Sequence, residues 1–589
     1  MLRSVLRNVL FGSALVASTI FADLTPGQRV EDFKHFWKSY KNAYVFFELK
    51  GNDFGVDWDV IKGDFITKLK TSTSDLELYR AVTEAQAMLR DGHCYNSSFS
   101  KIRETERIYF QRIGLTLAEG HKIVVNQVKA GTVFAENGVE IGDELVKWDD
   151  KSIRRLAREA RKMSSASSDG QFWNSFANSL YIHSPLLGKP KRSSAKLIFR
   201  KPNGDLVPVS SKWNSADPTG VPEATNGWIN DSKGVQLDEA SKIRIEGPLP
   251  LELRIFKEYN LAYLKIDSWM KTEDPKDQLE DTFKKVQGTD GMIVDFRGNG
   301  GGVGPWGVLF SNYLISEGDQ KKAKKSWISK IKDMFKGKKE TTEEVKTNGK
   351  VPNDVWFERK LSKVFMKLAF PQLNDEQMNE IYASPETMQY VLKKAFDMDI
   401  DLQEINKHVV DGVIDPFYVN LTLNDRTNDV ATYTKPVYVL TDGGCYSTTD
   451  ITLAILKDFN RIKTVGTPNG AGSGSPIPFV LPNSGLQVHV PHARAYPPSG
   501  TMIEGRPIAP DYLVTQTIED LKKGKDTVLT EAVARIMDEI MPTSTFNQSE
   551  VSVGKLKEPV IDWGNIPTPD FAIQATLEYQ KRLETNLSD

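Results

Sequence analysis

The chain has 589 residues, of which 39% are hydrophobic and 26% charged, and its formal net charge is −2. This length supplies enough apolar material for roughly two to four globular domains. The balanced mixture of charges gives no overall field that would recruit nucleic acid, so we expect no DNA or RNA partner.

The first 22 residues have the character of a targeting sequence. They contain Arg3 and Arg7, no acidic residue, and an apolar run that is too short to span a bilayer. We interpret residues 1–22 as a cleaved secretory signal, which predicts a secreted or periplasmic protein; a mitochondrial presequence is the alternative. The later sequence predicts no membrane span.

A helical N-terminal domain is predicted for residues 23–105. It ends at Asp91-Gly92, a turn signal that would present His93 just beyond the end of a helix. A lone histidine is more often structural than catalytic, so its position alone does not assign a role. Apolar residues at helical spacing predict three helices, over residues 30–44, 57–69 and 74–89.

Residues 106–205 change to short β-prone runs separated by glycine, which predicts a β-rich module. The segment 112–153 resembles a PDZ domain in its course of residues, carried by Val139, Gly142, Asp143, Leu145 and Trp148. PDZ modules bind extended chain termini by adding a strand to a sheet edge, which implies a docking site for polypeptides. A structural or autoinhibitory module is the alternative. The turn-rich residues 206–255 that follow predict a linker.

An α/β core is predicted for residues 256–540. A strand over 261–266, a helix over 279–286 and an apolar strand over 291–296 suggest a β-α-β unit. The glycine-rich residues 297–307 come next, where the backbone can approach a ligand closely.

This glycine-rich loop contains a literal GxGxxG at Gly302, Gly304 and Gly307. No second strand with a terminal acid follows at a suitable spacing, so we reject a dinucleotide site. Backbone N–H groups that bind an oxyanion explain the same glycines better.

Residues 317–350 form a lysine-rich insertion, which we interpret as a solvated segment. A basic docking patch is the alternative, because Trp327, Ile328, Ile331 and Phe335 would give a short helix an apolar side. Residues 351–423 are largely helical by pattern.

Residues 436–459 predict a buried strand, a sharp turn and an amphipathic helix, with Ser447 at the joint. A serine there is close to the unpaired N–H groups of the helix, which is typical of a nucleophile elbow. The alternative is a capping box, in which Ser447 and Asp450 only begin the helix.

Downstream, strands are predicted over 479–481 and 486–490 and expected to complete a sheet near the serine. Glu504 lies in a turn-rich loop, where an ordinary surface acid is the alternative. His489 and His492 lack a third ligand in register, so we predict no metal and no cofactor. A closing helix over 528–541 precedes a tail, residues 541–589.

Taken together, these motifs resemble the C-terminal processing (tail-specific) peptidase superfamily. The order and spacing hold from about residue 30 to residue 538, in the segments FFELKGNDFGVDWD, LELYRAVTEAQAMLRDGH, MIVDFRGNGGG and EGRPIAPD and in the serine stretch. The nearest likeness is to the branch of the Tricorn core and the chlamydial protease-like activity factor. The implied fold is a multidomain α/β protein with a ClpP/crotonase-like peptidase core.

The branch is distinguished by an absent lysine. The tail-specific branch carries a catalytic lysine in the loop after the serine helix, where this chain has Gly470-Ala471-Gly472-Ser473. The branch without that lysine uses a serine, a histidine and a glutamate, which the resemblance maps onto Ser447, His93 and Glu504.

A serine hydroxyl needs an imidazole to take its proton, and the imidazole needs an acceptor, here the Glu504 carboxylate, to hold its tautomer. The resemblance further implies an oxyanion hole of backbone N–H groups from Thr448 and from Gly300 or Gly301. The expected partner is a polypeptide substrate, and a homodimer is an open possibility of this family.

Two departures from the family lie beside the serine. Tyr446 replaces a small residue and is expected to narrow the pocket. Cys445 would approach Cys94 if Ser447 and His93 meet, so a disulfide or redox-sensitive pair is one hypothesis and two separate buried thiols the other.

We therefore predict an exported serine endopeptidase. A catalytically silent relative that binds peptide or lipid and an esterase with the same triad are the alternatives. The segment 213–247 is predicted to be an internal inhibitory segment that self-cleavage removes, by its likeness to the chlamydial relative.

Overall fold

The computed structural model describes residues 23–97, 108–184, 190–216, 242–316 and 430–541, with shorter pieces between 318 and 422. Several predicted features lie outside these described residues: the leader, nearly all of the lysine-rich insertion, most of the proposed inhibitory segment, and the tail after residue 541. None of the described helices has both the length and the apolar character needed to cross a bilayer.

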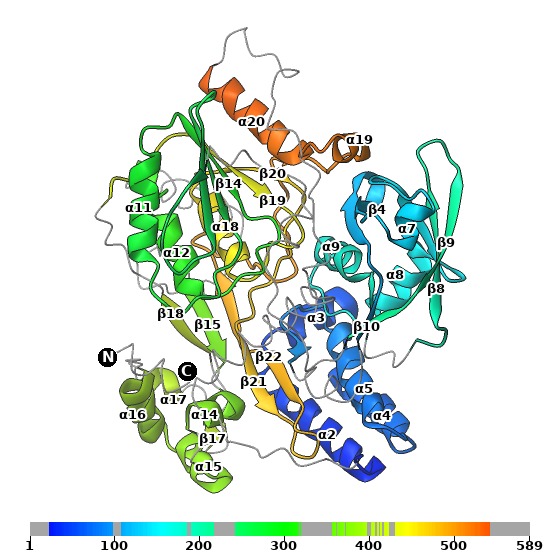
Figure 1. Cartoon of the computed structure of the whole chain (residues 1–589). Coiled ribbons are helices and arrows are strands. Elements are labelled where there is room, and N and C mark those ends of the chain that lie inside the picture. The colour runs from blue at the N-terminus through cyan, green and yellow to red at the C-terminus, as the bar shows by residue number, and fades with distance from the viewer. Residues whose placement is uncertain are drawn as a thin grey trace, which may run out of the picture.

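Four helices open the described chain, shown in blue in Figure 1. Three confirm the predicted helices, and the fourth, α3, was not predicted because it is short and contains Gly51. The α3 helix ends at Gly55, whose φ of 66° is the left-handed geometry that favours glycine at a helix end. The four are α2 (Pro26–Ala43), α3 (Phe47–Phe54), α4 (Trp58–Leu69) and α5 (Asp75–Met88).

These helices share their core with segments far along the chain. Their aromatic side chains pack in one cluster with Met366, Tyr382 and Val488, which come from the second half of the sequence. The hydroxyl of Tyr40 donates to the backbone oxygen of His489 at 2.5 Å. The N-terminal helices are therefore fixed to the rest of the molecule by a common hydrophobic core.

The second module has its own core and forms the unit drawn in cyan in Figure 1. Its sheet has the order β3-β4-β5-β8-β9, which leaves β3 at one edge, and β6 (Lys151–Ser152) pairs with β5. Strand β9 extends to Lys212, so the module runs past the predicted boundary at residue 205. The strands are β3 (Gly114–Ala118), β4 (Lys122–Gln127), β5 (Glu144–Trp148), β8 (Ser194–Arg200) and β9 (Leu206–Lys212). The helices are α7 (Val133–Glu136), α8 (Ile153–Arg161) and α9 (Asp169–Ser179).

A smaller sheet closes the module, in the order β10-β2-β7. It joins β2 (Ile108–Phe110), β7 (Ile182–His183) and β10 (Asn214–Ala216). Residues on both sides of 217–241 are thus strands, and only the interior of the predicted linker falls outside the described residues.

The third unit is a seven-stranded sheet with the order β11-β12-β13-β14-β19-β20-β24. The strands from β13 to β24 are parallel, as the predicted β-α-β unit requires, and β11 and β12 are antiparallel to their neighbours. The strands are β11 (Lys242–Ile243), β12 (Leu251–Phe256), β13 (Leu261–Ile266), β14 (Gly291–Asp295), β19 (Val437–Thr441), β20 (Lys463–Gly466) and β24 (Tyr512–Leu513).

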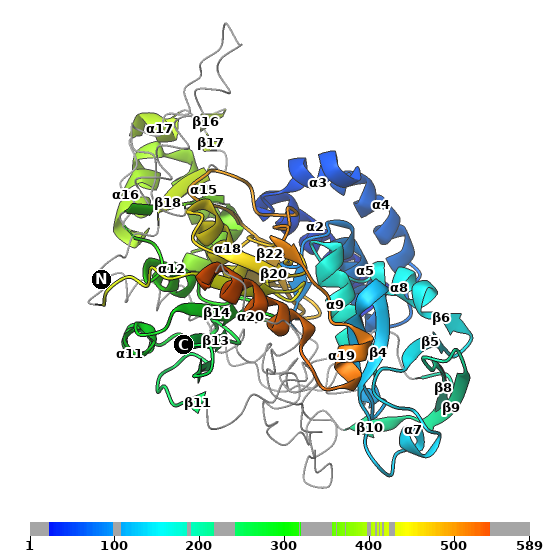
Figure 2. The ribbon, with the colours of Figure 1, turned by 90° about the horizontal axis from the view of Figure 1, so that it is seen from above.

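Helices cover both faces of this sheet, as Figure 2 shows from above. Along β13, Ala262 and Leu264 face the core under α11 (Lys276–Val286), α12 (Gly304–Asn312) and α18 (Thr448–Asp458). The alternate residues Leu261 and Tyr263 face α20 (Thr527–Ile540). A sheet buried on both faces explains why β14 and β19 are continuous apolar runs in the sequence.

Residues 356–422 combine helices with strands, although the pattern predicted mainly helix. The helices are α14 (Lys363–Ala369), α15 (Asp375–Ala383), α16 (Pro385–Phe396) and α17 (Leu402–Asn406), and β16 (Val409–Val410) pairs with β17 (Val413–Ile414). A further sheet has the order β18-β15-β23, from β15 (Trp356–Lys360), β18 (Tyr418–Thr422) and β23 (Ala493–Tyr496).

One small sheet brings the N-terminal helices to the core. The strand β1 (Tyr95–Asn96), which follows α5, pairs antiparallel with β22 (Gln487–Pro491), and β22 pairs with β21 (Pro476–Val480). The predicted strands near residues 480 and 490 are confirmed, but they form this separate sheet. This pairing joins positions almost 400 residues apart and so fixes where His93 lies.

The two cysteines are not bonded to each other, which excludes a disulfide in this structure. Neither forms a disulfide, and both are buried. Cys94 packs in the core of the N-terminal helices, and Cys445 packs under the serine turn, where its Sγ contacts the backbone oxygen of Phe296 at 3.1 Å. Proximity of Ser447 to His93 does not bring the thiols together, because the two side chains point into different cores.

Candidate active site

Ser447 lies at the joint between strand β19 and helix α18, as the predicted strand, turn and helix require. Its backbone has φ 58° and ψ −118°, a region that residues with a side chain rarely adopt. Such strain persists only where the surroundings hold it, and it is typical of a nucleophile elbow. Gly301 lies directly against this turn, since an added Cβ there would be 2.6 Å from the Ser447 Cβ.

Asp450 stabilises the turn at Ser447 through hydrogen bonds. Its carboxylate accepts the N–H of Ser447 at 3.0 Å, the side-chain amide of Asn469 at 2.6 Å and the N–H of Gly472 at 2.6 Å. Burial raises the pKa of Asp450 to about 8, against these donors. The capping-box pattern at Ser447 and Asp450 is therefore present, and it supports the strained turn.

His93 meets Ser447 across 354 residues of sequence, with Nε2 at 2.9 Å from the Ser447 Oγ. The histidine is buried, and this burial lowers its pKa to about 4 in spite of the opposing charge of Glu504. A neutral imidazole in contact with a serine hydroxyl is what a general base requires.

The other ring nitrogen of His93 has several polar neighbours. The Gly474 N–H lies at 3.2 Å from Nδ1, the Tyr446 hydroxyl at 3.3 Å, and Asp91 Oδ1 at 3.9 Å. Asp91 also accepts the backbone N–H of His93 at 2.9 Å and the hydroxyl of Tyr44 at 3.0 Å. Asp91 therefore fixes the loop that carries the histidine.

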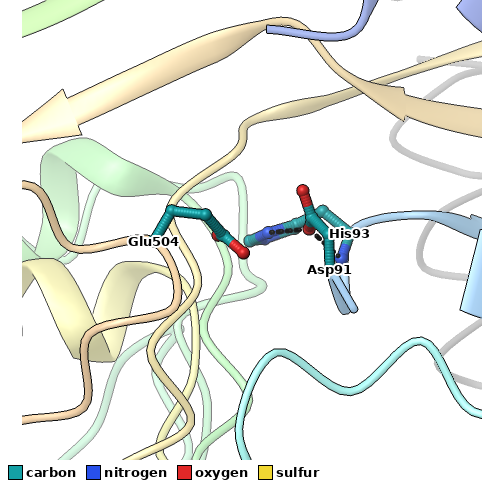
Figure 3. Close-up of side chains that lie close together, drawn as sticks. All are labelled: Asp91, His93 and Glu504. Atoms are coloured by element: carbon teal, nitrogen blue, oxygen red, sulfur yellow. Dashed lines mark hydrogen bonds and ion pairs between the residues drawn. The ribbon is translucent and has the colours of Figure 1, made fainter. Parts of the chain in front are cut away.

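Glu504 is fully buried, which overturns the surface alternative. Figure 3 shows its carboxylate pointing toward His93, and one atom of each of Glu504, His93 and Asp91 lies within 4.8 Å of the others. Glu504 Oε1 accepts from the ammonium of Lys50 at 2.8 Å, and Oε2 accepts from the N–H of Ser473 at 3.3 Å. The structure therefore brings all three predicted residues together, with Lys50 as the direct partner of the carboxylate.

Lys50 joins the Glu504 carboxylate to the N-terminal helices. It lies on α3, is fully buried, and also donates to the backbone oxygen of Arg90 at 2.9 Å. Burial lowers the pKa of Lys50, but the charges of Glu504 and Asp91 outweigh it and raise the pKa above its usual value. Burial and Asp91 raise the pKa of Glu504, and the Lys50 ammonium opposes them.

Two of the predicted oxyanion donors, Thr448 and Gly301, lie next to Ser447. Thr448 is the first residue of α18, where backbone N–H groups have no partner within the helix. Gly301 packs against Ser447 with φ 100°, and its N–H donates to Asn299 Oδ1 at 3.0 Å. Gly300 is exposed beside them, with open space around its Cα.

Asp91, His93 and Glu504 are close enough for one atom of each to ligate a metal ion. The Lys50 ammonium already places a positive charge on Glu504, and His93 Nε2 faces Ser447, so the arrangement fits acid-base chemistry better. The two further candidate ligands of the sequence analysis, His489 and His492, stack on Tyr95 and Phe365.

Sequence reasoning missed the role of Lys50. It stands in the segment FFELKGNDFGVDWD, which contributed to the family resemblance, but a single lysine in a short helix carries no signal for an ion pair with a residue 454 positions away.

Part of the chain is similar in sequence to known proteins. Residues 260–514 match the model of peptidase family S41. A carboxy-terminal-processing protease of Bartonella bacilliformis is 36% identical over 114 residues, and a Chlamydia pneumoniae protein is 33% identical over 107 residues. These alignments cover 19% and 18% of this chain, and only 25% and 17% of the relatives' own lengths.

Two solved structures share the fold. Mature CPAF complexed with lactacystin has a TM-score of 0.57 at 15% identity, covering 87% of this chain and 98% of that one. Mature CPAF alone has a TM-score of 0.57 at 16% identity, covering 89% and 99%. The class of protein to which these comparisons show a similarity is the serine-type peptidases. The chain is thus similar to the C-terminal processing peptidases, through its match to family S41 over residues 260–514, and it shares the fold of CPAF.

Proposed function

We propose that the protein is an exported serine endopeptidase that cleaves polypeptides through an acyl-enzyme intermediate. The observation that carries this proposal is the contact of 2.9 Å between His93 Nε2 and the Ser447 Oγ at a strained elbow. Export rests on the predicted leader, residues 1–22.

In the proposed reaction His93 Nε2 takes the proton of Ser447 as Oγ attacks the scissile carbonyl carbon. The negative charge that develops on the carbonyl oxygen faces the N–H of Thr448 and the glycine loop at residues 300–302. The imidazolium then gives its proton to the leaving amine. In the second half of the reaction His93 takes a proton from the water that attacks the acyl-enzyme and returns it to the Ser447 Oγ.

The Glu504 carboxylate stabilises the imidazolium electrostatically at a distance within 4.8 Å. Lys50 maintains this charge, because a buried carboxylate without a cation would take up a proton. With its pKa raised and its ammonium bound to Glu504, Lys50 is an anchor for the acid and not a base for Ser447.

The second module is proposed to dock the substrate as a PDZ-like domain. Its strand β3 lies at the edge of the sheet, with helix α9 packed beside it. An extended peptide could add to this edge and so present its chain to the elbow. This module favours a polypeptide substrate over the small ester of the esterase alternative.

The test compares mature protein and its Ser447→Ala variant on unfolded casein, with fragments followed by gel. We expect the natural protein to fragment casein and the folded variant to leave it intact. Hydrolysis of a small ester without cleavage of any unfolded protein would favour the esterase. Absence of both activities in folded protein would favour a relative that only binds.

A further inference from the structure

The side chain of Tyr446, which replaces the small residue of the family, is directed toward His93. The residue is only 8% exposed, and its ring lies 4.7 Å from the His93 ring at an angle of 32°. The tyrosine that we expected to narrow the pocket thus packs against the general base.

Glycines form the slot that holds this ring. An added Cβ would lie 2.0 Å from Tyr446 Cζ at Gly472, 2.6 Å from Cδ2 at Gly470 and 2.6 Å from the hydroxyl at Gly92. Contacts of that length do not occur, so any larger residue at these positions would displace the ring. Gly470 and Gly472 belong to the loop in which the other branch carries its catalytic lysine.

The hydroxyl of Tyr446 joins the second module to the base. It lies 3.3 Å from His93 Nδ1 and 2.9 Å from the Oγ of Ser167, a buried residue at the start of α9. Ser167 also accepts the N–H of Gly92 at 3.0 Å, next to the histidine itself. A single hydroxyl network therefore runs from the module to the loop of His93.

Catalysis requires one particular tautomer of His93. Nε2 can take the Ser447 proton only if it carries a lone pair, so the ring hydrogen must be on Nδ1 and needs an acceptor. The Gly474 N–H at 3.2 Å is a donor and favours the opposite tautomer. Asp91 Oδ1 is 3.9 Å from Nδ1, whereas the phenolic oxygen is 3.3 Å away, and the Glu504 oxygens already accept from Lys50 and Ser473.

We propose that Tyr446 is a positioning residue whose phenolic oxygen accepts the Nδ1–H of His93 while its own hydrogen is donated to Ser167. This inference rests on the proposed function of Ser447 and His93. A hydroxyl can donate or accept, so it suits both the resting ring and the reactive one. During acylation the Ser447 proton moves to Nε2 and then to the leaving amine, and Tyr446 neither gains nor loses a proton.

The test is Tyr446→Phe, which removes the oxygen and keeps the ring that fills the slot. The initial rate on fluorescein-labelled casein is divided by the concentration of active sites, which is titrated with a fluorophosphonate probe. The result is a rate per active site. We expect kcat to fall about 10- to 100-fold with KM nearly unchanged, because the hydroxyl acts on the base and not on substrate binding. Ser167→Ala should give a smaller loss, and the double variant should be no worse than Tyr446→Phe.

Tyr433→Phe is the matched control. Its hydroxyl is hydrogen-bonded at 2.8 Å to the hydroxyl of Thr289, the same kind of buried contact, in a part of the core outside the site. We expect its kcat per titrated site to equal that of the natural protein, although its thermal stability decreases as in Tyr446→Phe. Equal kcat values for Tyr446→Phe and this control would overturn the proposal.

A measurement that does not depend on peptidase activity separates failure of this inference from failure of the proposed function. In protein labelled with ¹⁵N-histidine, the His93 signal is assigned by His93→Asn, and the fraction of ring with hydrogen on Nδ1 is measured. This fraction should decrease in Tyr446→Phe, and an unchanged fraction contradicts the proposal even if casein is not cleaved. If Tyr446→Phe does not fold, the fraction of His93 rings with hydrogen on Nδ1 is measured in Ser167→Ala instead. An unchanged fraction in that variant overturns the inference.

Discussion

The two halves of the candidate site are built in different ways. The half that contains Ser447 comes from one continuous stretch, residues 436–459, in which strand, turn and helix follow directly from the sequence pattern. The half that contains His93, Glu504 and Lys50 is assembled from three separate segments and is fully buried. The difference teaches that the proposed nucleophile depends on backbone strain within one short stretch. The proposed base and its acid depend on a hydrophobic core that distant segments share.

The largest effect is expected from Ser447→Ala, which removes the nucleophile and leaves the assembled half intact. Activity on casein should fall by a factor of about 10⁶, because the remaining groups cannot form an acyl-enzyme. Thermal unfolding should occur at the same temperature or higher, since alanine removes only one oxygen. Residual cleavage that still labels with a fluorophosphonate would show that another serine is the nucleophile.

Lys50→Met should disrupt the half of the site that contains His93 and Glu504. It leaves Glu504 buried without its cation, so the free energy of unfolding should decrease by about 3–5 kcal/mol, and kcat should fall at least about 100-fold. Chemical denaturation and casein cleavage measure the two effects.

The control for this variant is Lys41→Met. Lys41 pairs with Asp59 at the same short distance of 2.9 Å, but both side chains are about half exposed or more. Because solvent screens such a pair, we expect little change in stability and none in kcat. Equal losses in the two lysine variants would contradict a special role for the buried pair.

Gly301→Ala should disturb the half of the site that contains Ser447. The backbone there has φ 100°, and the added methyl group would lie 2.6 Å from the Ser447 Cβ, so the elbow must shift. We expect kcat to fall about 100-fold with a smaller change in KM. Gly304→Ala, at the first residue of α12 and with open space around the added methyl group, should retain activity. A fully active Gly301→Ala would show that the elbow tolerates displacement.

The pH dependence of kcat/KM should report the protonation of His93. Burial lowers the pKa of His93 to about 4 from its usual 6.5, with Asp91, Glu504 and Lys50 as its charged neighbours. The acid limb of kcat/KM should therefore lie near pH 4, because Nε2 stays unprotonated above that value. A limb at the usual value for histidine would show that the base is solvated in the working enzyme.

Stability should change with pH in the same window. Unfolded His93 takes up a proton below pH 6.5 and the folded residue does so only near pH 4, so the free energy of unfolding decreases as pH falls between these values. His489, whose pKa burial lowers to about 3, adds to this loss without touching Ser447. In His489→Gln the decrease should be less steep by about 1.4 kcal/mol per pH unit, the contribution of one linked proton, with the acid limb of kcat/KM unchanged.

The smallest effect is expected from reductant. Cys94 and Cys445 form no disulfide with each other and lie in separate cores, so dithiothreitol should leave activity unchanged. Both thiols should react with Ellman's reagent only after denaturation, because both are buried. Faster inactivation under oxidising conditions would contradict this separation.

The sequence by itself determined many of the elements and the candidate nucleophile. Helical spacing predicted α2, α4 and α5, the apolar runs predicted β13, β14 and β19, and the serine at the end of β19 marked the elbow. These features depend on neighbours within a few residues, which is why periodicity and turn residues show them. The family resemblance also selected His93 and Glu504 from the chain, although neither had a local signal.

Only the tertiary structure decided how the base is held. The pairing of β1 with β22 sets His93 against Ser447, and the shared core of α2 to α5 with residues 363–490 places Lys50 beside Glu504. These contacts join positions hundreds of residues apart, and no periodicity encodes which buried charges will meet. The same reason applies to Tyr446, whose slot is formed by glycines from two distant loops.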